Sequence, residues 1–176
     1  MAPFPSSGQA PEHSHWYAIH TRPRNEKAVA AQLREKKVST FLPLLEQIRQ
    51  WSDRRRTIEV PMFSCYAFVR IAQSTEERLK VLRTPGVLGF VGSERWGASI
   101  PNEEIENLQR AIRQKLPCVV HPFIGAGQRV RSRGGSLDGM QGILMRESGE
   151  QSLVISIEVL QRSVQIRVEG YNVEAV

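Results

Sequence analysis

The last fifty residues constrain the fold most, because they contain only short extended segments. Turn residues separate five of these segments, which lie near 128–132, 141–146, 152–160, 162–168 and 171–175. Strands this short and this closely spaced are typical of a small barrel. The sequence therefore predicts an all-β domain over residues 126–176.

One stretch of this region fits two patterns. From Leu153 to Val168, alternation predicts strands, whereas a helical stripe is formed by Leu153, Ile157, Leu160, Val164 and Val168. Seven residues of the stretch are Val or Ile, whose branched side chains favour strands. We therefore predict a β barrel whose open face, including Leu160, is available to a partner.

The first part of the chain mixes helices and strands. The patterns predict a strand at 16–20, a helix at 25–37, a hairpin of 41–51 with 57–71, a helix after the capping box 74–77, a strand at 87–91 and a helix from 102. This order favours an α+β fold, with helices packed on an antiparallel sheet. We expect a flexible tail at 1–14, a domain at 15–112 and a linker at 113–125.

Charge and composition limit the classes of function. The net charge is +6, and residues 22–56 hold ten basic and four acidic side chains, so the excess is concentrated there. Such a patch is suited to a phosphate backbone, although charge runs are usually solvated faces. Two cysteines, Cys65 and Cys118, form no disulfide framework, which favours a reducing cytoplasm. No stretch approaches the roughly 18 apolar residues of a membrane span.

The residues give no support for an enzyme. The four histidines, at 13, 15, 20 and 121, show no zinc spacing with cysteine. Cys65 lies in an expected strand, where a small buried residue is a simpler interpretation than a nucleophile. The glycines near 134–139 are not followed by the lysine and helix of a phosphate loop. We expect no catalytic residue, no metal and no cofactor.

Several motifs occur together in the order of a known family. Trp16-Tyr17, PMFSCYAFV at 61–69 and TPGVLGFVG at 84–92 resemble the NGN domain of the NusG family of transcription elongation factors. AGQRVRSRGGSLDGMQGIL at 126–144 resembles that family's KOW domain, an SH3-like barrel. The final segment is similar to the specialised paralogues of the family. The resemblance implies an NGN domain followed by a KOW domain.

The resemblance also implies which residues bind. In the family, aromatic side chains line a concave surface that holds the clamp helices of RNA polymerase. On this chain the matching residues are Phe63 and Tyr66, helped by Trp16 and Phe90; for Phe90, a position in the core is the stronger interpretation. Alternation places Tyr66 and Phe68 on one face of the strand and Ala67 and Val69 on the other.

A second implied surface faces nucleic acid. Arg22 matches a basic position after the first strand, and Arg83-Thr84 match a loop that faces the non-template DNA strand in specialised paralogues. The chain departs from the family at Ser64-Cys65, where Pro-Gly usually stands, so the shape of the backbone there is an open question.

The resemblance implies a monomeric, cytoplasmic transcription elongation or antitermination factor. Its KOW domain would bind either a small-subunit ribosomal protein or the termination factor Rho. The alternative is an RNA-binding or ribosome-associated protein that acts through the KOW barrel, because small barrels with this motif also occur in ribosomal proteins. The sequence leaves open whether the factor acts on all genes or on one operon.

Overall fold

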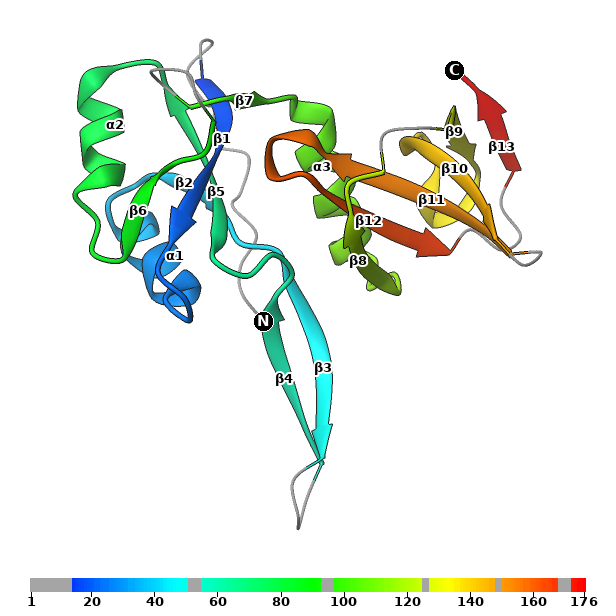
Figure 1. The fold of residues 1–176 in the computed structure, drawn as a ribbon, viewed down its shortest axis with the longest axis horizontal. Coiled ribbons are helices and arrows are strands. Elements are labelled where there is room, and N and C mark those ends of the chain that lie inside the picture. Colours follow the sequence, from blue (N-terminus) through cyan, green and yellow to red (C-terminus); the bar gives the residue numbers. More distant parts are fainter. Residues whose placement is uncertain (1–13, 51–54, 93–96, 125–126, 148–149, 168–171) are drawn as a thin grey trace. The chain divides into compact units, whose positions relative to one another are not determined.

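The structure is a computed structural model that describes residues 14–50, 55–92, 97–124, 127–147, 150–167 and 172–176 (Figure 1). Two compact units divide between Pro101 and Asn102. Each unit is described by itself below.

The first unit is built on a five-stranded antiparallel sheet. Its strands are β1 (Ser14–Thr21), β2 (Ser39–Phe41), β5 (Tyr66–Ala72), β6 (Val87–Phe90) and β7 (Ser99–Ile100). The order is β2-β5-β1-β6, and β7 pairs with β1 beside β6. The strand predicted at 16–20 is therefore the central one, which is paired along both edges.

Two helices cover one face of this sheet. They are α1 (Glu26–Glu35) and α2 (Thr75–Leu82). α1 forms where Val29, Ala30 and Leu33 recur at helical spacing, and these three side chains are fully buried against the sheet. α2 begins at the predicted capping box, because Ser74 Oγ accepts a hydrogen bond from the Glu77 amide at 3.2 Å.

A separate two-stranded ribbon leaves the sheet. It consists of β3 (Leu44–Gln50) and β4 (Arg55–Pro61), which pair with each other. The hairpin predicted from the sequence is confirmed, but residues 57–71 are not one strand. The chain turns over 62–65, and β5 then joins the main sheet. The amide of Met62 donates to Pro43 O at 2.8 Å and closes the base of the ribbon.

The second unit contains a six-stranded antiparallel sheet. Its strands are β8 (Cys118–Pro122), β9 (Gln128–Arg133), β10 (Gln141–Glu147), β11 (Glu150–Ile157), β12 (Arg162–Arg167) and β13 (Asn172–Ala175). The order is β13-β9-β10-β11-β12-β8. Strands thus form over most of 153–168, as predicted, with a short 3-10 helix, η2 (Glu158–Leu160), between β11 and β12. A second 3-10 helix, η1 (Gly135–Leu137), lies between β9 and β10.

Strand β8 was not expected, because the sequence predicts a loose linker over 113–125. β8 pairs with β12 from Cys118 opposite Ile166 to Pro122 opposite Arg162. Ile124, which follows β8 by two residues, also binds the sheet. Its amide donates to Ser163 Oγ and its carbonyl accepts a hydrogen bond from Ser156 Oγ, both at 2.8 Å. This part of the expected linker is therefore a strand of the second sheet.

The last helix, α3 (Asn102–Arg113), is grouped with the second unit by its contacts. Asn107 Nδ2 donates to Gln141 O at 3.2 Å, and Arg110 Nη1 donates to Asp138 O. The sequence led us to place residues 102–112 with the first domain. The domain boundaries at 112 and 126 stay a prediction.

Candidate functional site

The first sheet presents two different faces. On β1, Tyr17 and Ile19 point to the helices, together with Ala67 and Val69 of β5. Alternate residues point the other way, and Ala18 lies opposite Phe68 in the β1–β5 pairing. The predicted alternation of β5 is confirmed. The face away from α1 and α2 is called the aromatic face below.

Four aromatic side chains of the first unit gather on the aromatic face around Phe68. The Phe68 ring stacks on Phe41 with centroids 6.0 Å apart and meets Phe63 edge-on at 6.1 Å. Such offset and edge-to-face arrangements add stability beyond the buried area. Tyr66 lies two residues earlier on the same face, where its ring tilts against His20 at 5.3 Å.

Exposure separates these residues into two groups. Phe63 is 3% exposed, Trp16 is 6% exposed and Phe68 is fully buried. Tyr66 is half-buried, and its neighbour His20 is exposed. Of the rings assigned to the aromatic face, those of Tyr66 and His20 are therefore accessible, whereas those of Phe63 and Trp16 are buried. His20 was not predicted, although its place opposite Tyr66 follows from pairing the two strands.

The structure does not bring Phe90 to the aromatic face. Phe90 lies opposite Ile19 on the helix side, where its ring meets Tyr17 edge-on at 5.9 Å. The guanidinium of Arg78 lies 4.7 Å from the centre of the same ring. These contacts favour the core position that was the stronger interpretation of Phe90.

The turn before β5 explains how Phe63 reaches the aromatic face. Cys65 has φ +68°, a left-handed conformation that glycine adopts without strain. The carboxylate of Glu26, itself 5% exposed, accepts the Cys65 amide at 2.7 Å. The turn thus takes a glycine-like shape although the family's Pro-Gly is replaced, and it breaks the alternation between Phe63 and Tyr66.

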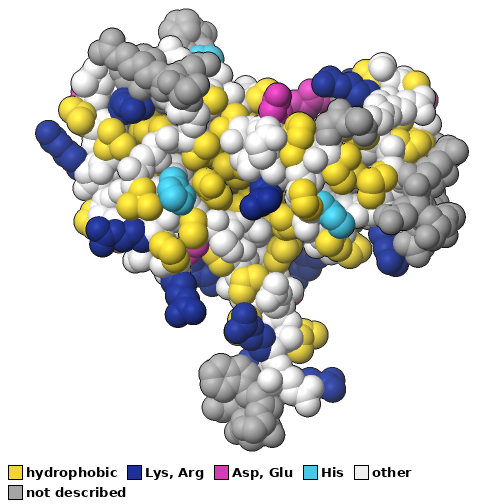
Figure 2. Space-filling view, viewed as in Figure 1, with side chains coloured by type: hydrophobic (Ala, Val, Ile, Leu, Met, Phe, Trp, Pro, Cys, Tyr) yellow, Lys and Arg dark blue, Asp and Glu magenta, His cyan; other side chains and the backbone are white. Residues whose placement is uncertain are grey.

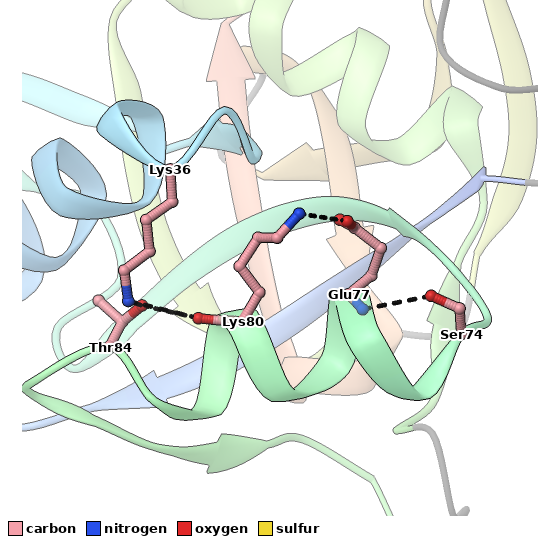
Figure 3. Close-up of polar contacts among 5 residues, drawn as sticks. All are labelled: Lys36, Ser74, Glu77, Lys80 and Thr84. Atoms are coloured by element: carbon pink, nitrogen blue, oxygen red, sulfur yellow. Dashed lines mark hydrogen bonds and ion pairs between the residues drawn. The ribbon is translucent and has the colours of Figure 1, made fainter.

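The second predicted surface is only partly exposed. Arg22 and Arg83 are exposed, and the Arg22 amide donates to Gly86 O at 2.8 Å, so the ends of β1 and α2 lie together. Thr84 is 1% exposed and points inward (Figure 3). Its hydroxyl accepts Lys36 Nζ at 2.8 Å and donates to Lys80 O at 3.1 Å. Thr84 therefore holds the loop instead of facing outward.

Lys36 links the ends of two helices in this region. Its ammonium lies at the C-terminal end of α2, 3.5 Å from Lys80 O, where the helix dipole favours a cation (Figure 3). The neighbouring Lys80 pairs with Glu77, and this hydrogen bond raises the pKa of the Lys80 ammonium. Arg22 and Arg83 therefore lie in two adjoining loops. The backbone bond from Arg22 to Gly86 joins these loops, and the bonds of Thr84 hold the loop after α2.

On the second unit, Leu160 is 8% exposed in η2, which differs from the open position that we expected. The exposed apolar side chains of this unit include Val119 on β8 and Phe123 just after it.

Burial raises the pKa of Glu104 on α3 to about 7, and the charge of Glu158 adds to the effect. Burial also raises the pKa of the Cys118 thiol to about 11, so the thiol is protonated at neutral pH.

The residues that the structure describes contain neither a cluster suited to a metal ion nor a helix suited to a membrane. Among these residues, no group of three or more His, Cys, Asp or Glu side chains is arranged to hold a metal ion. No helix that the structure describes is both long enough and apolar enough to cross a membrane.

Comparison with known proteins decides the family. The family described as "Transcription termination factor nusG" matches residues 14–109, which include the first sheet and most of α3. The chain belongs to the NusG family. Members of this family are transcription factors and not enzymes.

Two named proteins and one solved structure are similar to this chain. The transcription termination/antitermination protein NusG of Staphylococcus carnosus is 25% identical over 173 residues, which cover 90% of this chain and 94% of the relative. The protein of the same name from Staphylococcus aureus (strain Mu50) is 26% identical over the same shares. A solved structure titled "Domain interaction in Thermotoga maritima NusG" is 21% identical, covers 87% of this chain and 92% of its own, and has a TM-score of 0.47.

Proposed function

We propose that this NusG-family chain is a transcription elongation or antitermination factor that binds the clamp helices of RNA polymerase through the aromatic face of its first sheet. The observation that carries the proposal is the accessible Tyr66–His20 pair, which lies on the same face of the sheet as the buried ring of Phe68. Aromatic side chains bury large areas with few rotatable bonds, so they are favoured at the centre of interfaces.

The supporting residues have a different role from Tyr66. Phe63 and Trp16 are buried, so they fix the shape of the surface and leave the direct contact to Tyr66 and His20. A factor bound in this way acts without chemistry. By binding one conformation of the polymerase more tightly than another, it shifts the population toward the active state.

Nucleic acid lies near a second surface in this proposal. Arg22 and Arg83 are exposed at adjoining loops, where their guanidinium groups are able to pair with phosphates of the non-template strand. Thr84 acts through the hydrogen bonds that hold this loop in place.

The second unit recruits another protein in this proposal. We propose that this unit contains a KOW domain with an SH3-like barrel, whose partner is a small-subunit ribosomal protein or Rho. Val119 and Phe123 replace Leu160 as the candidate contacts, because they are 56% and 37% exposed.

An RNA-binding or ribosome-associated protein is the second candidate. It is favoured by the exposed arginines on the second sheet, such as Arg129 and Arg162. In this case the aromatic face has no polymerase partner, and RNA binds through the C-terminal strands.

One experiment separates the two candidates. Purified full-length chain is immobilised and offered either labelled RNA or core RNA polymerase, the latter with and without a soluble clamp-helix fragment as competitor. The first candidate predicts retention of polymerase that the fragment abolishes. Retention of RNA but not of polymerase would instead establish the second candidate.

A further inference from the structure

We propose that the ribbon of β3 and β4 is a separate binding site for the phosphate backbone of a duplex nucleic acid. The site consists of Arg49, Arg55 and Arg56, which lie on the outer half of the ribbon. The choice of nucleic acid as the class of partner rests on the proposed function. The binding itself is independent of the polymerase surface.

The ribbon has little support beyond its base. From Glu46 to Gln50 every residue of β3 is exposed, and so are Arg55 to Thr57 of β4. Ile48 is 74% exposed, although an apolar side chain of this size is usually covered. The outer half is therefore available on both of its faces.

The base of the ribbon is anchored to the body of the unit. Lys27 Nζ on α1 donates to Glu59 O at 2.8 Å and lies 4.0 Å from the carboxylate of the same residue. Together with the Met62–Pro43 hydrogen bond, this contact fixes the direction in which the ribbon leaves the sheet. The exposed end is thus a positioned extension of the first unit.

The pairing of the strands brings like charges together. Arg49 lies directly opposite Arg56, so both guanidinium groups share one face of the ribbon. Like charges at opposite positions destabilise a strand pair. Arg55 lies opposite Gln50 and, by alternation, points to the other face. Figure 2 shows Lys and Arg side chains gathered along the ribbon.

Two lysines of the basic stretch 22–56 differ from the ribbon arginines. Lys27 binds Glu59, and Lys36 binds Thr84 and the end of α2, so both have internal partners. Within the described ranges, Arg49, Arg55 and Arg56 have no ion-pair or side-chain hydrogen-bond partner. The two lysines therefore stabilise the fold, whereas the three arginines of the ribbon lack a counterion among the described residues.

The chemistry of these three residues favours phosphate. All are arginines, whose planar fork binds phosphate oxygens in pairs. A two-stranded ribbon also has the width that the major groove of a duplex admits. Single-strand binding sites usually include aromatic rings that stack on bases, and the described strands of the ribbon contain none. Trp51 lies outside the described residues.

The test measures binding of the full-length chain to nucleic acid without polymerase. Fluorescence anisotropy is recorded with duplex DNA, duplex RNA and single-stranded DNA over a range of salt concentrations. The variant is Arg49→Ala/Arg56→Ala. The matched control is Arg34→Ala/Arg113→Ala, which removes two exposed arginines from the last turns of α1 and α3 and changes the net charge equally.

We expect the ribbon variant to bind duplex at least about tenfold more weakly than the control. The slope of log affinity against log salt should fall by about two, because two phosphate contacts are lost. The unfolding temperature should not fall, since removing the two arginines also removes the repulsion between them. Arg49→Lys/Arg56→Lys keeps both charges, so it should keep the salt slope and lose less affinity than the Ala pair.

Three results would overturn the proposal. Equal duplex affinity and slope in the ribbon variant and the control would show that the site does not bind phosphate. Binding of single strands in place of duplex would assign the arginines to another partner. An equal loss in the Lys and Ala pairs with unchanged slope would make the arginines structural. None of these results depends on whether the chain binds polymerase.

Discussion

The two faces of the first sheet come from alternate residues of the same strands, yet they have different surroundings. On the helix side, Ile19 and Val69 are fully buried against Val29 and Leu33. On the aromatic face, the cluster around Phe68 ends in the accessible Tyr66–His20 pair. The difference shows that one strand is able to stabilise the fold with one set of side chains and present a binding surface with the other.

The turn at Cys65 makes this division possible. In a regular strand, Phe63 and Tyr66 point to opposite faces, because they are three positions apart. The left-handed backbone of Cys65 sends both to the aromatic face, and Glu26 on α1 holds the turn. The helix side of the sheet therefore supports the shape of the opposite face.

The largest loss of folding stability should come from a substitution in the buried part of the aromatic face. Phe63→Ala should lower the free energy of unfolding by about 3–5 kcal/mol, because it leaves a cavity beside Phe68. Urea unfolding followed by circular dichroism measures the change. Leu88→Ala is the control, since Leu88 is 52% exposed, and it should cost about 0.5 kcal/mol or less.

A loss below about 1 kcal/mol for Phe63→Ala would contradict the division into buried and accessible rings. Phe63 would then be open to solvent, and it would become a direct contact of the kind that we assign to Tyr66.

The next effect concerns the contact between α1 and the turn. Glu26→Ala removes the acceptor of the Cys65 amide and should lower the free energy of unfolding by about 2 kcal/mol. Glu26→Gln retains an acceptor oxygen and should cost less. Equal losses for the two variants would show that the hydrogen bond does not support the turn.

The smallest effect on stability should be a gain. Cys65→Gly relieves a left-handed conformation that costs an L-residue about 1–2 kcal/mol, although glycine loses more entropy on folding. We expect a net gain of about 0.5–1 kcal/mol in the free energy of unfolding. Ser64→Gly is the neighbouring control and should give no gain. A destabilised Cys65→Gly would mean that the thiol contributes packing that outweighs the strain.

The sequence predicts the local features of the first unit well. The alternation of β5, the helix with Val29 and Leu33, and the capping box at Ser74 all depend on nearby residues. Phe63 was harder to place, because its direction depends on a turn that Glu26 stabilises from 39 residues away in sequence.

The corrected features share this dependence on distant residues. Thr84 points inward because Lys36, 48 residues earlier, binds its hydroxyl. The strand β8 forms because it pairs with the edge of β12. The short sequence before Pro122 does not by itself indicate this pairing. The exposure of Leu160 was wrongly expected because η2 interrupts the strand alternation there.

The most direct test of the account is the affinity of full-length chain for core RNA polymerase when the accessible pair is changed. Tyr66→Ala and His20→Ala are compared with Leu88→Ala, and thermal unfolding is measured for each. We predict that Tyr66→Ala weakens binding by about 2 kcal/mol, or roughly 30-fold, while the unfolding temperature changes little. Leu88→Ala should bind like the parent. Parental affinity in both Tyr66→Ala and His20→Ala would contradict the claim that the aromatic face is the polymerase-binding surface.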